Sequence, residues 1–125
     1  MSTSDATATA QTYTGSCHCG AVRYEATLEL NEVISCNCSI CSRTGALLAF
    51  VPLDRFKLLS GADAQRDYQF GKKHIHHHFC QTCGVRSFAA SAKPDGTEMR
   101  ALNVRCLDGV DVSKLSVRFF DGKSR

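Results

Sequence analysis

Three cysteines fall within six residues of this chain, and their spacing constrains the fold more than any other feature. They are Cys36, Cys38 and Cys41, in the segment CNCSIC, and no fourth cysteine or histidine follows nearby. Structural zinc is normally closed by four protein ligands, whereas three protein ligands leave one tetrahedral position for water or substrate. The segment therefore predicts a metal site with one open position.

Four of the remaining cysteines form two close pairs. The pairs are Cys17 with Cys19 and Cys80 with Cys83. A glycine follows the second cysteine of each pair. Because glycine tolerates a positive φ, it lets a tight loop wrap a metal and turn its amides towards sulfur. The two pairs predict a separate, closed Cys₄ site, and only Cys106 is left unassigned.

Eight cysteines in 125 residues could instead form the disulfide framework of a secreted protein. The spacing argues against this alternative, because C-x-C and C-x-x-C turns converge on one ion more easily than they bond internally. The first ten residues lack the basic and apolar regions of a secretory signal. No apolar run approaches the ~20 residues of a membrane span. We therefore expect reduced thiols, a cytoplasmic protein and no membrane partner.

The charge of the chain gives little support to nucleic-acid binding. The formal net charge is +3 with neutral histidines, and thiolates bound to zinc would lower it further. The basic residues are scattered, and no aromatic platform alternates with them. We expect small-molecule partners, with a weak preference for anions.

Alternation of apolar and polar residues predicts a mostly β chain. Residues 1–14 have little to bury and are expected to be a disordered leader, followed by one domain at 15–125. In the first predicted strand, alternate residues face inward. They are Val22, Tyr24, Ala26 and Leu28. Further strands are expected at 32–35, 46–51, 65–70, 74–79, 85–90, 99–104 and 117–120. A helical turn capped by Ser39 should stop at Gly45, and a short helix is expected at 110–115.

Three segments together resemble one known family. CHCGAV at 17–22, CNCSICSRTG at 36–45 and FCQTCG at 79–84 are similar, in this order, to the glutathione-dependent formaldehyde-activating enzymes. That family includes the centromere protein V type domains. NVRCLDG at 103–109 and FDG at 120–122 are similar too, so the resemblance spans about residues 15 to 122. It implies a β-tent fold, with two antiparallel sheets pinned by zinc. It also implies structural zinc on the two cysteine pairs and catalytic zinc on the CNCSIC segment, as ligand counting does.

The activity implied by the resemblance is addition of glutathione to formaldehyde, giving S-hydroxymethylglutathione. This is the reaction of a carbon-sulfur lyase in the synthetic direction. Coordination could deprotonate the thiol, or zinc could polarise the aldehyde, and the sequence leaves both routes open. Glutathione carries two carboxylates and one ammonium, so Arg43 and Arg105 are candidates to bind it. The alternative is that both arginines are ordinary surface charges.

Other metal-binding residue types have simpler explanations. His74, His76 and His78 should share one face of a strand, where they could complete the second metal's shell or bind a further ion. A polar edge strand, or adventitious metal affinity, explains them better. His18 is expected at the surface, and Cys106 is expected to be a small buried apolar group, with a place beside the open zinc as its alternative.

Three classes of function remain in competition. The first is a zinc-dependent enzyme that forms or cleaves a carbon-sulfur bond on a small thiol. The second is a carrier of glutathione or another thiol, without turnover. The third is a zinc-stabilised protein-interaction module, in which a fourth protein ligand would close the CNCSIC site. Each class is compatible with a homo-oligomer.

Overall fold

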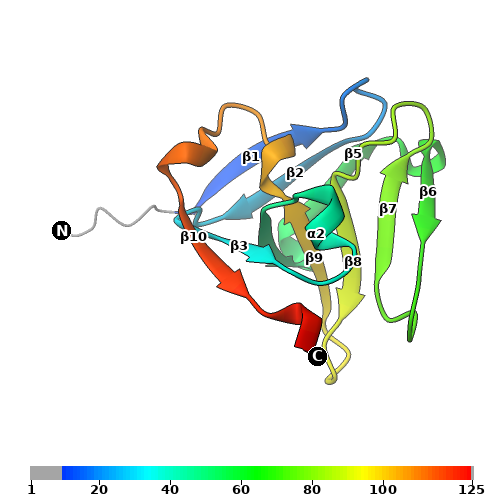
Figure 1. Cartoon of the computed structure of the whole chain (residues 1–125). Coiled ribbons are helices and arrows are strands. Elements are labelled where there is room, and N and C mark those ends of the chain that lie inside the picture. Colours follow the sequence, from blue (N-terminus) through cyan, green and yellow to red (C-terminus); the bar gives the residue numbers. More distant parts are fainter. Residues whose placement is uncertain (1–9, 125) are drawn as a thin grey trace.

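Two β-sheets make up most of the molecule (Figure 1). The structure is a computed structural model, and it describes residues 10–124. The smaller sheet has the order β1-β2-β5 and is antiparallel. Its strands are β1 (Gln11–Ser16), β2 (Arg23–Leu28) and β5 (Phe56–Ser60). The larger sheet has the order β10-β3-β4-β9-β8-β7-β6. Its strands are β3 (Glu32–Cys36), β4 (Leu48–Pro52), β6 (Gln65–Tyr68), β7 (His76–Cys80), β8 (Phe88–Ala92), β9 (Glu98–Asn103) and β10 (Ser116–Phe120).

Among residues 10–124, the helical segments are all short. They are α2 (Cys41–Thr44) and the 3₁₀ turns η1 (Leu53–Arg55), η2 (Ala62–Ala64), η3 (Val104–Cys106), η4 (Val112–Lys114) and η5 (Gly122–Ser124). The helix expected at 110–115 is only the single turn η4, and Asp111 caps it by accepting a hydrogen bond from the Ser113 amide. The mostly β architecture in two sheets is as the sequence predicts.

The core lies where the two sheets face each other, and the alternation of β2 explains how it forms. Tyr24 of β2 is fully buried, and the other inward residues of this strand are buried with it. The rings of Phe56 and Phe88 lie 5.3 and 5.7 Å from the Tyr24 ring, centroid to centroid. A Cβ at Gly15 would lie 2.6 Å from this tyrosine ring. Only glycine therefore lets β1 pass over the packed aromatic group.

Two predictions from the sequence are corrected here. Residues 11–14, expected in the leader, form most of β1, because backbone pairing with β2 orders a segment that has few apolar side chains to bury. Residues 1–9 lie outside the described residues. The sheets are not wholly antiparallel, since β10 runs parallel to β3 at one edge of the larger sheet. The connection from β9 through η3 and η4 is long enough to return the chain in that direction.

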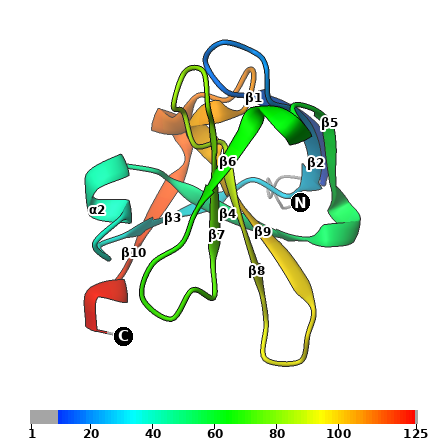
Figure 2. The ribbon, with the colours of Figure 1, turned by 90° about the vertical axis from the view of Figure 1, so that its right-hand side faces the viewer.

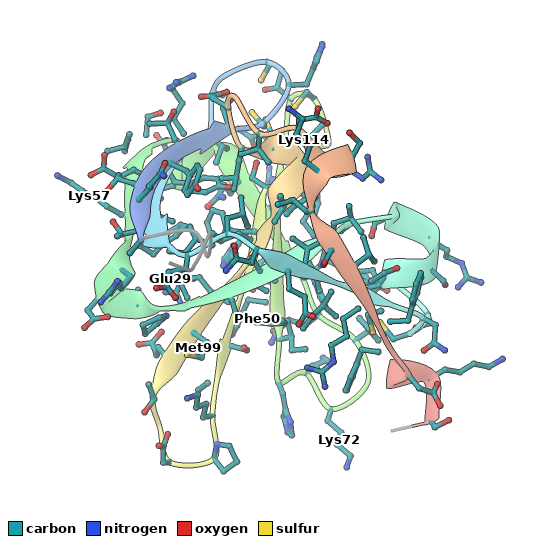
Figure 3. All side chains as sticks on the ribbon, turned by 90° about the vertical axis from the view of Figure 1, so that its left-hand side faces the viewer. Glu29, Phe50, Lys57, Lys72, Met99 and Lys114 are labelled. Atoms are coloured by element: carbon teal, nitrogen blue, oxygen red, sulfur yellow. The ribbon has the colours of Figure 1, made fainter. Side chains whose placement is uncertain are left out.

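The surface shows no concentration of the labelled basic side chains. Lys57, Lys72 and Lys114 project outward at separate places on the molecule (Figure 3). This agrees with the scattered charge of the sequence. Within residues 10–124, no helix combines the length and the apolar character needed to cross a bilayer.

Candidate metal centre

The two cysteine pairs meet at one end of the molecule. The first lies in the loop between β1 and β2. The second has Cys80 at the end of β7 and Cys83 in the loop that leads to β8, and both views show these loops side by side (Figures 1 and 2). The two loops close in the same way, because the Cys17 amide donates to the Val22 carbonyl and the Cys80 amide to the Val85 carbonyl. The glycines after each pair have φ of 85° and 79°, as expected for tight loops.

The four sulfur atoms of these pairs form one cluster, which we call the four-thiol cluster. All lie within 4.8 Å of one another, and Cys19 Sγ is 3.7 Å from Cys17 Sγ and 3.6 Å from Cys80 Sγ. These separations are too long for disulfide bonds, which are about 2.05 Å. The predicted Cys₄ set is therefore assembled with free thiols.

Backbone amides around this cluster favour thiolates. The Val22 amide donates to Cys17 Sγ and the Thr82 amide to Cys80 Sγ, each at 3.4 Å. Hydrogen bonds from the backbone amides of Cys19 and Val85 lower the pKa of Cys83 to about 6. Thiolates held by amides in a tetrahedral-sized cluster suit a closed zinc site.

The second group of sulfurs, the three-thiol cluster, lies where β3 passes into α2. Cys36 ends β3, Cys41 begins α2, and these two sulfurs and that of Cys38 lie within 4.8 Å of one another. Among residues 10–124 no histidine, aspartate, glutamate or further cysteine joins the group. Gly45 ends the helix with a left-handed φ of 71°, as predicted. Ser39 is not the N-cap, because Ile40 takes that position and makes no side-chain cap.

Burial and hydrogen bonding act in opposite directions on the thiols of the three-thiol cluster. Burial raises the pKa of Cys41 to about 12, since a thiolate there loses hydration. Burial acts in the same direction on Cys38, but the backbone amides of Cys41 and Ile40 and the neighbouring thiols bring its pKa below the ordinary value. The Cys38 amide also donates to Cys36 Sγ, at 3.4 Å. Three soft sulfur donors in this arrangement fit zinc, with Cys41 losing its proton on metal binding.

The C-terminal segment fastens the loop that carries these thiols. Asn37 makes three hydrogen bonds to this segment, and it donates two of them, from its backbone amide to the Phe120 carbonyl and from its side chain to Asp121 Oδ1 at 2.9 Å. Its Oδ1 also accepts a hydrogen bond from the Lys123 amide, at 2.8 Å. A Cβ at Gly122 would lie 2.5 Å from Cys36 Sγ. The end of β10 and η5 therefore pack directly on the cluster.

A cavity of about 310 Å³ opens beside the three-thiol cluster, and all three of its cysteines line the wall. Most of the remaining wall is apolar. It includes Ile34, Ile40, Phe50, Phe70, Ile75 and Phe120. Phe50 is placed on β4, between the β8–β9 hairpin and β10 (Figure 3). The cavity thus joins a metal-binding group to a largely apolar space.

Two polar residues of this cavity, His77 and Arg86, were not identified from the sequence. His77 is only 5% exposed, and Arg86 Nη1 lies 2.5 Å from its Nδ1. Because arginine has only donors, Nδ1 accepts this bond, and the ring proton of the neutral imidazole is on Nε2. Burial, with the charge of Arg86, lowers the pKa of His77 to about 4. In the described part of the chain, Nε2 has no hydrogen-bond partner.

His77 belongs to the same histidine-rich segment as His74, His76 and His78, but it lies on the opposite face of the strand from the one that those three were expected to share. His76 and His78 share a face of β7, with ring centroids 6.1 Å apart, whereas His74 precedes the strand. His76 Nδ1 lies 2.6 Å from Asp67 Oδ2 on the neighbouring strand. None of these three belongs to a cluster of potential metal ligands among residues 10–124. Strand alternation places His77, the histidine between them, on the opposite face, which lines the cavity. The edge-strand position expected for this run is wrong, because β7 lies between β8 and β6.

The two arginines predicted to bind glutathione lie in different surroundings. Arg43 of α2 donates from Nη1 to the Ser39 carbonyl at 2.7 Å, and it lines an open hollow next to the cavity. Arg105 of η3 donates from Nε to the Gly45 carbonyl at 3.3 Å and does not line the cavity. The structure therefore brings Arg43, but not Arg105, to the edge of the site.

The other predicted positions are simpler. His18 is exposed in the first loop, as expected. Cys106 lies in η3, half-buried, and burial raises its pKa. It belongs to neither thiol cluster and does not line the cavity. Its alternative place beside the open site is therefore wrong.

Comparison with known proteins agrees with this arrangement. The chain resembles a crystal structure of a protein from Rhodobacter sphaeroides, with a TM-score of 0.71 and 34% sequence identity. The match covers 84% of this chain and 99% of the other. The family model described as glutathione-dependent formaldehyde-activating enzyme matches residues 12–121, which include both thiol clusters and the cavity. With residues 12–121 of the 125-residue chain matched, the chain belongs to the glutathione-dependent formaldehyde-activating enzyme family.

Proposed function

We propose that the protein is a zinc-dependent enzyme that joins glutathione to formaldehyde and forms S-hydroxymethylglutathione. The observation that carries this proposal is the three-thiol cluster on the wall of a cavity, with no fourth ligand group among the described residues. The four-thiol cluster would hold a second, structural zinc. Family membership supports the choice of glutathione and formaldehyde.

The reaction needs no oxidant or reductant. The thiol sulfur attacks the carbonyl carbon, a carbon-sulfur bond forms, and the carbon-oxygen double bond becomes single. The proton lost by the thiol is balanced by the proton gained at the new hydroxyl. A zinc ion held by Cys36, Cys38 and Cys41 would supply a Lewis acid with one exchangeable position.

The remaining residues of the cavity support this chemistry by position and exclusion of water. The apolar walls reduce the water that competes for the aldehyde. His77 offers a neutral Nε2–H donor, suited to an oxygen that becomes more negative as the bond forms. Arg43 lies in the adjoining hollow, where its free guanidinium donors could receive a carboxylate of glutathione.

A carrier of glutathione would use the same site without turnover. Exchange spectroscopy with ¹³C-formaldehyde and glutathione separates these two functions. The zinc-loaded protein should accelerate exchange between formaldehyde hydrate and S-hydroxymethylglutathione above the rate in buffer. Cys41→Ser should abolish this acceleration, and Cys106→Ser, outside the cavity, should preserve it.

Binding of glutathione can be followed independently with cobalt in place of zinc. A sulfur-to-metal charge-transfer band should rise on addition of glutathione, and a glutathione analogue with serine in place of cysteine should not produce this rise. A response to glutathione without faster exchange would favour the carrier. No response to glutathione would remove this function altogether.

A further inference from the structure

The cavity beside the three-thiol cluster is larger than formaldehyde requires. Formaldehyde has two heavy atoms and needs roughly the volume of two water molecules, each about 30 Å³ in the liquid. The cavity volume of about 310 Å³ lies at the lower end of the range for small-molecule sites. An organic group of several carbon atoms therefore fits beside the thiols.

The mouth of the cavity is an exposed apolar surface. Phe50, Phe70, Ile75 and Phe120 all line it and are between 37% and 48% exposed. Large apolar side chains gathered at one opening are typical of a ligand site, because a bound apolar group removes them from water. Single exposed residues such as Leu59 have no such common location.

Glutathione itself does not match this interior. It brings two carboxylates and an ammonium, whereas the polar side chains lining the cavity, beyond the thiols, are His77, Arg86 and Ser91. One guanidinium nitrogen of Arg86 is already bound to His77. The adjoining hollow is more polar, with Ser39, Arg43 and Tyr68, and it shares Ile40 and Phe70 with the cavity. The hollow therefore suits the glutathione peptide. The cavity is then available to the other reactant, the aldehyde.

Two buried donors without a partner among residues 10–124, His77 Nε2 and Arg86 Nη2, belong to residues that line the cavity, and the first of them indicates how an aldehyde would lie there. His77 Nε2–H is buried and has no partner among the described residues. The imidazole is fixed from two sides, by Arg86 at Nδ1 and by the Phe70 ring, which stacks on it at 5.5 Å between centroids. A buried donor without a partner is costly, and a carbonyl oxygen would satisfy it.

We propose that the cavity binds aldehydes with an apolar substituent, such as an unbranched alkyl chain of three to five carbons, whose oxygen accepts a hydrogen bond from His77 Nε2. The proposal rests on the function proposed above and extends its electrophile from formaldehyde to a class of apolar aldehydes. Glutathione adds to the carbonyl carbon as before, and the product is a hemithioacetal with one new carbon-sulfur bond and one hydroxyl.

A homologous series of aldehydes tests this proposal with the zinc-loaded protein. Each methylene that becomes buried should strengthen binding roughly threefold to fourfold. From propanal to hexanal with glutathione, KM should therefore fall about 30- to 60-fold in total, after subtraction of the rate in buffer. A KM that is constant or rises along the series overturns the proposal.

Two substitutions on one strand provide a matched pair. Ser91→Leu would fill the cavity from β8, whereas Ala92→Leu adds the same side chain at the next residue, which is exposed and does not line the cavity. The first should remove the dependence on chain length, and the second should retain it. Equal behaviour of the two variants overturns the proposal, and if Ser91→Leu does not fold, the wild-type series decides alone.

Binding without chemistry distinguishes this proposal from the function itself. Hexan-1-ol should shift the ¹⁵N and ¹H resonances of His77 Nε2–H and bind at least tenfold more tightly than propan-1-ol. If the protein turns over formaldehyde but binds both alcohols equally, the proposed function stands and the apolar site is wrong. If it turns over no aldehyde, the proposed function fails, and the alcohol series decides whether the apolar site exists.

Discussion

The two thiol clusters use the same residue type in different structural contexts. The four-thiol cluster joins loops whose cysteines are at least 61 residues apart, and Cys17, Cys80 and Cys83 pack with the main core. The three-thiol cluster is local to six residues and packs with a separate small apolar group that includes Ala46 and Leu48. Closing a long loop changes the entropy of the unfolded chain, whereas a local turn changes it little. We infer that the first cluster holds the fold and that the second is available for chemistry.

The largest effect expected from this difference is on stability. Cys83→Ser should lower the free energy of unfolding of the zinc-loaded protein by more than about 4 kcal/mol, because it opens a metal site that joins two distant hairpin loops. Cys38→Ser should lower it far less. Chemical denaturation of the two variants side by side measures this, and equal losses would remove the distinction between the clusters.

The grouping of the cysteines into two clusters could be predicted from their spacing. Most of the strands could be predicted from the alternation of apolar and polar residues. Ligand counting groups the cysteines as the structure does, and the alternation of β2 identifies its buried face. Pairing between distant segments has no local signal, so neither β1 nor the parallel β10–β3 edge was expected. His77 and Arg86 were missed for the same reason. They come from different strands and loops, and only the packed sheet brings them to the thiols.

The next effect concerns how the C-terminal segment holds the three-thiol cluster. Gly122→Ala would place a methyl group 2.5 Å from Cys36 Sγ, so the thiol loop or η5 has to move. Affinity for zinc at this cluster should fall about tenfold, as it does when groups behind metal ligands are disturbed. Competition with a chromophoric chelator measures the loss as easier release of one zinc equivalent.

Lys123→Ala is the control for this substitution, because only the backbone amide of Lys123 contacts Asn37. The tightly held equivalent at the four-thiol cluster should be unchanged in both variants. If Gly122→Ala releases both equivalents more easily, the clusters are coupled and the comparison fails.

A smaller effect is expected on the pH dependence of stability, which should differ between the regions of the three-thiol and four-thiol clusters. The pKa of His77 falls from 6.5 to about 4 on folding, so below pH 6.5 the unfolded chain takes up a proton that the folded chain refuses. Stability from this residue is therefore complete above pH 6.5 and is lost as pH falls towards 4. Between pH 7.5 and 5.5, wild type should lose about 1 kcal/mol more than His77→Gln. His18→Gln, at the exposed position in the four-thiol region, is the control, and urea denaturation at both pH values gives the comparison.

The smallest effect tests the polar side of the three-thiol region, where the peptide of glutathione should lie. Arg43 is exposed, and an exposed ion pair contributes at most about 1 kcal/mol, so Arg43→Gln should raise KM for glutathione about three- to fivefold with little change in kcat. Arg105→Gln should change KM by less than about twofold, because its guanidinium bonds the Gly45 carbonyl away from the cavity. Steady-state kinetics with formaldehyde at saturation separates the two. A larger rise in KM for Arg105→Gln would mean that the peptide approaches from the end of α2, and the hollow beside Arg43 would then not be the glutathione site.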